Sequence, residues 1–419
     1  MQELADLTRT AGADVVGSDV QRRSGIEPAH FIGMGKVAEI RDLYAEGSFD
    51  IVVCNEDLSP RQQRNLEREL KVRVLDRTEV ILEIFAQHAR THEGRLQVEA
   101  ARLHHQLPRL IGSYSYDRQT GGQRGGLGAR GGPGEQQIES ERRRIRKRIR
   151  DLDQEIEHVR AQRSEQRAGR RRAELETAAI VGYTNAGKST LLNALTGARV
   201  RAEHRLFATL DPTTRRLDLP TGRGLLLTDT VGFIQKLPTD LVAAFRATLE
   251  EVTEADMVIQ VLDASSPAVM EQADTVEKEL VELGAADKPR VVVLNKCDLL
   301  GPAQRRRLVA SMTKRYPAGV VPVSATQAAG LEPLLAAIEE ASRGDTVELD
   351  LLVPYGSESV LASLRRIGAI ERTEYVATGT RAWGWAPRHA AGRFESYRAG
   401  AGAELSGTGG SRRARRRPG

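Results

Sequence analysis

Short apolar runs alternate with apolar residues at helical spacing along the first 75 residues. Ser59-Pro60 is a typical helix start, and Val72 to Leu75 alternates apolar and polar side chains as a strand does. The expected elements are helices near 2–11, 35–46 and 59–70 and strands at 51–53 and 72–75. This alternation predicts a small α/β domain over residues 1–75.

Two long helical patterns follow, on either side of a glycine-rich tract. From Asp76 to about Leu110, apolar residues recur every three or four positions, which predicts one continuous helix with Gly94 as its weak point. A heptad-like apolar stripe then runs from Ile138 to Val159. The simplest assembly is an antiparallel helical hairpin over residues 76–175 with a glycine-rich tip at 112–134, and an interdomain linker is the alternative.

From Thr177 the chain changes to short Val/Ile/Leu runs separated by helical stretches. Such runs read as buried parallel strands, so residues 176–343 are predicted to form an open doubly wound α/β sheet. A smaller α+β domain is expected at 344–387, and a basic, disordered tail at 388–419. The expected strands are 179–181, 225–227, 257–262, 291–294 and 320–323.

The composition is that of a protein that folds in water, with 40% hydrophobic and 28% charged residues. The N-terminal residues carry charges where a signal peptide needs an apolar run, and no stretch of about 18 apolar residues occurs. We therefore expect a cytoplasmic protein without membrane insertion. Cys54 and Cys297 lie far apart without histidine neighbours, which excludes a disulfide framework and a four-ligand zinc site.

The positive charge is concentrated in two segments. Residues 391–419 carry seven arginines and two glutamates, and residues 121–175 carry fifteen basic and nine acidic side chains. Clustered arginine suits a polyanion such as RNA, whereas a solvated helix face and a disordered tail are the alternative.

A phosphate-binding motif connects a predicted strand to a predicted helix. It has the form G-x-x-x-x-G-K-S and runs from Gly182 to Ser189. Its backbone N–H groups can surround phosphates, Lys188 can neutralise the β and γ oxygens, and the Ser189 hydroxyl can bind Mg²⁺. The motif residues are Gly182, Tyr183, Thr184, Asn185, Ala186, Gly187, Lys188 and Ser189, with Thr190 next.

Three further motifs follow at predicted strand ends, in the order that a GTPase needs. Asp229 opens D-T-V-G and can hold Mg²⁺ through water, while the N–H of Gly232 can reach the γ-phosphate. In the motif Asn295-Lys296-Cys297-Asp298, the Asp298 carboxylate can accept hydrogen bonds from guanine, which predicts GTP over ATP. Ser324-Ala325 is placed to contact the base through its backbone, and Lys296 to cover the face of the base.

Two features concern hydrolysis. The segment 206–215 holds three candidate switch threonines, of which spacing favours Thr213 or Thr214 over Thr209. Phe233 stands after Gly232, where many GTPases have a glutamine that orients water. A phenyl ring cannot bind water, so unaided hydrolysis should be slow and a partner should complete the site, although Phe233 can also simply pack under the switch.

The order of motifs resembles the HflX family of translational GTPases over about residues 10–380. The most distinctive strings are FIGMGK, LSPRQQRNLE, VLDRTEVILEIFAQHARTHEGRLQVE, LGARGGPGEQQIESERRR, LFATLDPTTR and DTVGFIQKLP. The resemblance implies binding to the large ribosomal subunit and GTP-linked dissociation of ribosomes. By that resemblance Thr213 becomes the preferred switch threonine, and the hairpin tip, with Arg124 and Arg130, the part that approaches ribosomal RNA. Family members usually have another strand before the first helix, so this chain is expected to start late.

The motifs and the resemblance together predict a Mg²⁺-dependent GTPase. Lys188, Thr213 and Gly232 are the expected catalytic residues, and Ser189, Thr213 and Asp229 the expected metal ligands. The expected partners are GTP or GDP, the large subunit and its RNA, with a monomer away from the ribosome. The alternatives are a GTPase of ribosome assembly and a GTP-gated ribosome-binding scaffold with incidental turnover.

Overall fold

The computed structural model describes most of the chain. It covers residues 2–22, 25–45, 47, 49–113, 133–172, 176–197, 206–235, 249–343 and 346–399. Most of the expected glycine-rich tip, with Arg124 and Arg130, and the last part of the expected tail lie outside these residues.

The N-terminal part has the predicted alternation of helices and strands. β1 and β2 pair in parallel, and apolar side chains of α2 and α3 cover them. Ser59 begins α3 in a reciprocal capping arrangement with Gln62, as the Ser-Pro signal predicts. The elements are α1 (Gln2–Thr10), α2 (Met34–Ala45), β1 (Ile51–Val53), α3 (Pro60–Leu70) and β2 (Arg73–Leu75).

The continuous helix predicted from Asp76 is wrong, because the chain breaks into two helices. α4 (Arg77–His88) ends before an extended Ala89, and α5 (His92–Ser113) begins again two residues before Gly94. The N–H groups of Arg90 and Thr91 at the break donate to the Asp211 carboxylate. This partner lies 120 residues from Thr91 along the chain, so no local pattern could reveal the break.

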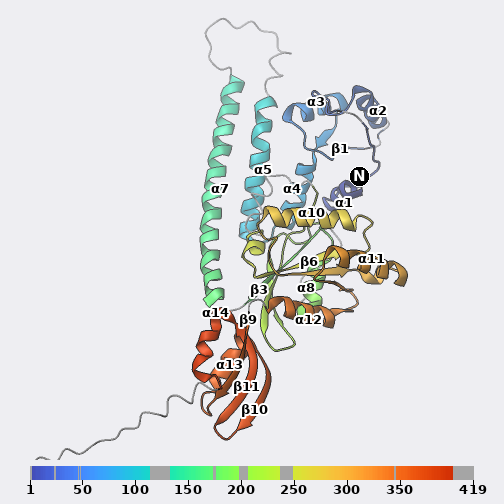
Figure 1. The fold of residues 1–419 in the computed structure, drawn as a ribbon. Coiled ribbons are helices and arrows are strands. Elements are labelled where there is room, and N and C mark those ends of the chain that lie inside the picture. The colour runs from blue at the N-terminus through green and yellow to red at the C-terminus, as the bar shows by residue number, and fades with distance from the viewer. Residues whose placement is uncertain are drawn as a thin grey trace, which may run out of the picture.

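α5 pairs with the long helix α7 (Pro133–Arg172), and the two run side by side in Figure 1. Leu96 and Ala100 of α5 pack against Leu152 and Ile156 of α7, which belong to the predicted stripe. The pairing of the predicted hairpin helices is therefore confirmed, while the domain limits stay a prediction. Within the described part of the chain, no helix is both long and apolar enough to cross a membrane.

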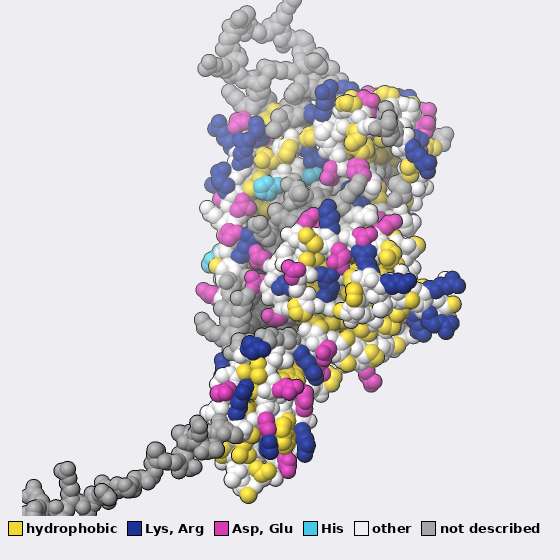
Figure 2. All heavy atoms as spheres, viewed as in Figure 1, with side chains coloured by type: hydrophobic (Ala, Val, Ile, Leu, Met, Phe, Trp, Pro, Cys, Tyr) yellow, Lys and Arg dark blue, Asp and Glu magenta, His cyan; other side chains and the backbone are white. Residues whose placement is uncertain are grey.

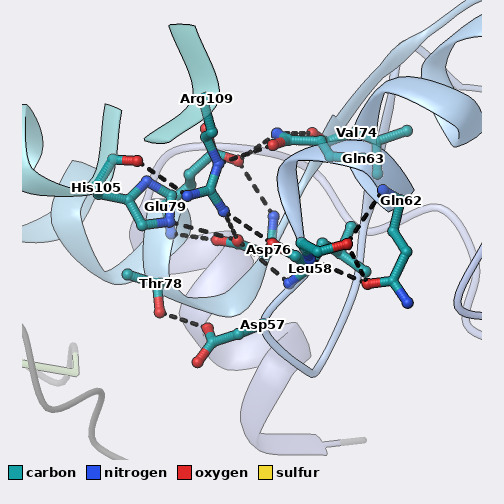
Figure 3. Close-up of polar contacts among 11 residues, drawn as sticks. Asp57, Leu58, Gln62, Gln63, Val74, Asp76, Thr78, Glu79, His105 and Arg109 are labelled. Atoms are coloured by element: carbon teal, nitrogen blue, oxygen red, sulfur yellow. Dashed lines mark hydrogen bonds and ion pairs between the residues drawn. The ribbon is translucent and has the colours of Figure 1, made fainter. Parts of the chain in front are cut away.

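A buried ionic cluster fastens the second half of α5 to the N-terminal part (Figure 3). Asp76 is fully buried, caps α4 through the Glu79 N–H at 2.8 Å, and is paired with Arg109 and with His105 at 3.4 Å. Burial raises the pKa of Asp76, but the hydrogen bonds from His105 and Glu79 and the charges of His105 and Arg109 outweigh it and hold the pKa below its usual value. Gln63 of α3 joins the cluster by accepting from Arg109 at 2.9 Å.

The C-terminal half of the described chain contains a six-stranded sheet of order β4-β5-β3-β6-β7-β8. Five strands are parallel, as predicted, and the edge strand β4 is antiparallel to β5 and was not predicted. The strands are β3 (Glu176–Gly182), β4 (Thr213–Asp218), β5 (Gly224–Asp229), β6 (Met257–Asp263), β7 (Arg290–Asn295) and β8 (Val320–Pro322). The named helices are α8 (Lys188–Thr196), α10 (Val269–Glu282), η1 (Cys297–Leu299), α11 (Pro302–Arg315) and α12 (Leu331–Ser342).

One apolar core joins the N-terminal helices to this sheet. Leu7 of α1 and Phe85 of α4 are fully buried in the same cluster as Val181 of β3 and Val258 of β6. Phe207 and Phe233, which follow the phosphate loop in sequence, belong to it as well. The nucleotide-binding segments therefore share a core with α1 and α4.

A second, three-stranded antiparallel sheet of order β10-β11-β9 forms the small C-terminal domain. The predicted tail begins too early, because residues 388–399 continue this fold: Phe394 is buried in its core and the Ala399 N–H donates to the Asp350 carbonyl. The elements are β9 (Thr346–Val353), α13 (Glu358–Ile367), β10 (Ala369–Val376), β11 (Gly379–Pro387), α14 (Arg388–Ala391) and η2 (Gly392–Tyr397).

Candidate nucleotide-binding site

The loop between β3 and α8 requires glycine at two positions. Gly182 and Gly187 have φ angles of 155° and 92°, and a Cβ on either would collide with a neighbour, the backbone of Val261 or the side chain of Asn295. Asn185 takes a φ of 60°, which asparagine tolerates better than most residues. A loop of this kind before a helix N-terminus directs backbone N–H groups at a phosphate.

Lys188 is buried at the base of this loop. Its ammonium donates to the carbonyl oxygens of Gly182 at 3.2 Å and Tyr183 at 3.0 Å. Burial lowers its pKa to about 8, although the negative charge of Asp229 opposes the shift. A buried ammonium next to inward-turned amides is suited to an anionic ligand.

Three oxygen-bearing side chains meet beside Lys188. The Ser189 hydroxyl donates to Oδ2 of Asp229 at 2.6 Å, and the Thr209 hydroxyl lies 2.7 Å from the Ser189 oxygen and 3.0 Å from Asp229 Oδ2. Asp229 is fully buried, and within the described part of the chain no side-chain or backbone group is hydrogen-bonded to its Oδ1. Burial raises the pKa of Asp229, and Lys188, Ser189 and Thr209 oppose the shift.

The structure brings Thr209, and not the favoured Thr213 or Thr214, to this cluster. Thr213 begins β4 and pairs with Asp229 across the strands, while the Thr214 hydroxyl lies 2.9 Å from the hydroxyl of Thr228. Strand pairing starts at Thr213, and neither Thr213 nor Thr214 lines the cleft. Thr209 lines the cleft directly.

Asn295 ties the phosphate loop to the other end of the site. Its Nδ2 donates to the Ala186 carbonyl at 2.9 Å, and its Oδ1 accepts from the Ala325 N–H at 3.0 Å. Lys296 has a φ of 63° and its ammonium lies 2.7 Å from Asp263. Asp298 follows with an exposed side chain, free of the packing that holds Asn295.

The cleft that these segments enclose has a volume of about 420 Å³. The predicted residues that do not line it are Gly182, Tyr183, Ala186, Thr213, Asp229, Ser324 and Ala325. Asp229 and Ala325 contact residues that do, while Ser324 bonds within its own loop. Residues that the sequence analysis did not name for the site are Phe207, Ala208, Thr230, Leu299 and Thr326. Each lies within two residues of a recognised motif or of the candidate Thr209, and this nearness is the local feature that could have indicated them. The lining residues are Thr184, Asn185, Gly187, Lys188, Ser189, Thr190, Phe207, Ala208, Thr209, Thr230, Gly232, Asn295, Lys296, Asp298, Leu299 and Thr326.

Phe233 packs beneath the cleft. It is 2% exposed, its N–H donates to the Gly182 carbonyl at 3.0 Å, and its carbonyl accepts from Thr184 at 2.8 Å. Gln235 is exposed, and its N–H donates to the Tyr183 hydroxyl at 2.9 Å. The packing role that we considered for Phe233 is thus confirmed.

The phosphate loop, the hydroxyl and carboxylate cluster, and the N-K-x-D motif at the far end of the same cleft define a P-loop GTPase domain on a doubly wound sheet. Sequence comparison agrees. Residues 1–86, 88–170 and 177–296 match families described as GTP-binding GTPase N-terminal, GTP-binding GTPase Middle Region and 50S ribosome-binding GTPase.

Two relatives extend the match to nearly the whole chain. The GTPase HflX of Caldanaerobacter subterraneus subsp. tengcongensis is 45% identical over 379 residues, which cover 90% of this chain and 85% of the relative. The GTPase HflX of Escherichia coli is 41% identical over 372 residues, or 89% and 86% of the two chains. The chain therefore belongs to the HflX family of GTPases. A crystal structure of a GTP-binding protein from Sulfolobus solfataricus in complex with GDP is 27% identical, covers 81% of this chain and 94% of its own, and superposes with a TM-score of 0.44.

Proposed function

We propose that this GTPase binds the large ribosomal subunit and uses the GTP state to dissociate ribosomes into subunits. The observation that carries the proposal is the long basic helix α7, which is held on α5 next to a GTPase domain whose family is described as ribosome-binding. Its place of action is the cytoplasm, where ribosomes are found.

The basic side chains of α7 gather toward its N-terminal end (Figure 2). Arg144, Arg146, Lys147 and Arg150 are all exposed there. Arg148 is paired with Glu99 of α5 through two hydrogen bonds of 2.7 and 2.9 Å, which orient the helix and leave its outer face to solvent. A rigid row of cations suits the phosphate backbone of RNA.

Three oxygen donors of the cleft fit a Mg²⁺ ion. Ser189, Thr209 and Asp229 supply two hydroxyls and a carboxylate, the hard ligands that Mg²⁺ prefers. The buried Oδ1 of Asp229 has no hydrogen-bond partner among the described residues, and a cation or water could satisfy it. When bound, the ion neutralises charge on the β- and γ-phosphates. We assign Ser189, Thr209 and Asp229 as the residues that would bind Mg²⁺, with Thr209 in place of the expected Thr213.

Other residues of the cleft are assigned to phosphate binding, base recognition and hydrolysis. The Lys188 ammonium lies on the phosphate loop, beside the place where the phosphates would bind. The exposed carboxylate of Asp298 can accept hydrogen bonds from both N–H donors of guanine, which adenine lacks. A Cβ on Gly232 would lie 2.9 Å from the Lys188 ammonium, so only glycine lets the backbone approach the γ-phosphate position. Phe233 cannot orient water, so we infer that the ribosome completes the site for hydrolysis.

The test is sedimentation of ribosomes with the full chain and a non-hydrolysable GTP analogue, compared with GDP. We expect co-sedimentation with the large subunit, appearance of free subunits, and GTP hydrolysis that ribosomes accelerate. Replacing Arg144, Lys147 and Arg150 by glutamine should weaken binding and reduce its salt dependence.

The matched control changes an equally basic surface elsewhere. Arg305, Arg306 and Arg307 of α11 are exposed, and their replacement by glutamine should leave ribosome binding unchanged. Stoichiometric binding without ribosome-stimulated turnover would favour the GTP-gated scaffold. Association with incomplete large subunits alone would favour a role in ribosome assembly.

A further inference from the structure

The segment that carries Thr209 is held on both sides by the N-terminal helices. Phe207, two residues before Thr209, has a φ of 55° and packs edge-on against Phe85 of α4 with ring centroids 4.7 Å apart. Asp211, two residues after Thr209, reaches the start of α5. Thr209 itself remains on Ser189 and Asp229.

Asp211 caps α5 from a distant part of the chain. Its Oδ2 accepts the N–H groups of Arg90 at 3.0 Å and Thr91 at 2.9 Å, and its Oδ1 accepts the Thr91 hydroxyl. The Thr91 oxygen in turn accepts the N–H of Gly94 at 2.9 Å. The N–H groups of Arg90 and Thr91 lie just before the first residue of α5, His92, and a negative charge beside a helix N-terminus is stabilising. Asp211 therefore contributes both hydrogen bonds and charge to the α5 start.

α5 connects this cap to the rest of the N-terminal half. Further along the helix, Glu99 pairs with Arg148 of α7, and Arg109 pairs with the buried Asp76. α5 is therefore bonded at its start by Asp211 and further along by the Glu99–Arg148 and Arg109–Asp76 pairs. A change at Asp211 therefore reaches α7 without passing through the residues outside the described structure.

We propose that Asp211 is a positioning residue that ties the Thr209 segment to the N-terminal end of α5, so that nucleotide state and the seating of α5 change together. Linkage makes the coupling reciprocal: a GTP analogue that holds Thr209 in the cleft stabilises the hydrogen bonds of Asp211 to the α5 start, and a partner that moves α5 changes GTP affinity. This regulation rests on Thr209 belonging to the proposed Mg²⁺ site.

The test uses the full chain with Mg²⁺ and guanosine 5′-(β,γ-imido)triphosphate. Asp211→Ala should lower affinity for this analogue about fivefold, the usual effect of losing a capping residue, and change GDP affinity less. Asp211→Asn keeps an acceptor for the two backbone N–H groups and should recover part of the loss. Equal loss for both nucleotides, or no recovery with asparagine, would overturn the assignment.

Hydrogen exchange at the amides of Arg90 to Arg95 gives a second readout. The analogue should protect these amides more than GDP does, and Asp211→Ala should abolish that difference. A purely structural role would change exchange equally in both nucleotide states, which would also overturn the proposal.

Gly94 offers a variant that leaves Asp211 in place. A Cβ there would lie 2.5 Å from Asp211 Oδ1 and 3.1 Å from the Thr91 oxygen, so Gly94→Ala must displace the carboxylate while strengthening the helix. We expect unchanged or higher thermal stability with the nucleotide difference in exchange lost. Gly35→Ala in α2, where a Cβ meets open space, is the control and should keep the difference.

Thr209→Val separates this proposal from the assignment of the site. If Thr209→Val leaves analogue affinity unchanged, the Mg²⁺ site is wrong and the coupling with it. If Thr209→Val weakens the analogue while Asp211→Ala and Gly94→Ala behave as wild type, the coupling alone is wrong.

Discussion

Thr209→Val is the sharpest test of how the nucleotide site is built. Valine keeps the shape of threonine but removes the hydroxyl that contacts Ser189 at 2.7 Å and Asp229 at 3.0 Å. The partner that the Thr209 hydroxyl loses is the Asp229 carboxylate, an ionised or metal-bound group. The contact is buried, because Asp229 has no exposed surface. A hydrogen bond to a charged group contributes about 1.5–3 kcal/mol.

This energy corresponds to about a tenfold to hundredfold loss of Mg²⁺-dependent affinity for a GTP analogue. The assay is a titration of a fluorescent GTP analogue at several Mg²⁺ concentrations. GDP affinity should fall less, because a Mg²⁺ ion held by Thr209 would neutralise charge on a γ-phosphate that GDP lacks.

Thr213→Val and Thr214→Val are the matched controls. Thr213 lies on β4 and should have no effect on nucleotide binding. Thr214→Val loses only the 2.9 Å contact between the hydroxyls of Thr214 and Thr228. It should lower the free energy of unfolding by about 1 kcal/mol and leave the Mg²⁺ dependence of nucleotide affinity unchanged. Loss of Mg²⁺ dependence in Thr213→Val with a normal Thr209→Val would refute the reasoning.

Three further outcomes follow from the site and from the buried cluster. Asp298→Asn should weaken GTP and improve xanthosine triphosphate binding, which a comparison of their affinities with that of ATP checks; unchanged preference would remove Asp298 from the base site. Arg109→Leu leaves Asp76 buried without its arginine partner and should cost about 3–5 kcal/mol in urea unfolding, with part regained when Asp76→Asn is added; a loss below about 1 kcal/mol would contradict a structural ion pair. The pKa of Asp76 is lowered, so its contribution should be present above the unfolded value of about 3.9 and lost as pH falls through the native pKa; an unfolding midpoint whose acid dependence is the same in wild type and Asp76→Asn would contradict this.

The parallel strands and the phosphate loop could be predicted because their signals are local. Each buried strand is a short Val/Ile/Leu run, and the loop needs its glycines at fixed spacing for backbone reasons that Gly182 and Gly187 display. The order of four motifs along the chain fixed which strand ends would meet, since parallel strands present their carboxyl ends at one edge.

The errors share a different cause, because each depends on a partner far away in sequence. The break between α4 and α5 is set by Asp211, and the choice of Thr209 is set by pairing of β4 with β5. Residues 388–399 look like a weakly apolar tail, yet Phe394 finds a core made by β9 and α13. The periodicity and spacing of residues along the chain do not reveal contacts between residues that are far apart in sequence.

The position of the shared core has a consequence for how nucleotide state is sensed. Glu3 of α1 accepts the hydroxyl of Tyr183 in the phosphate loop, and Arg77 of α4 binds both Glu3 and, at 2.9 Å, the carbonyl of Gln235. The phosphate loop, the segment after Gly232 and the segment around Thr209 thus each contact the N-terminal helices. Sequence families divide the chain at residues 86–88 and 170–177, whereas the packing does not separate these parts. Because the two halves bury one another's apolar surface, a shift in any of these described segments must be accommodated by α1, α4 or α5.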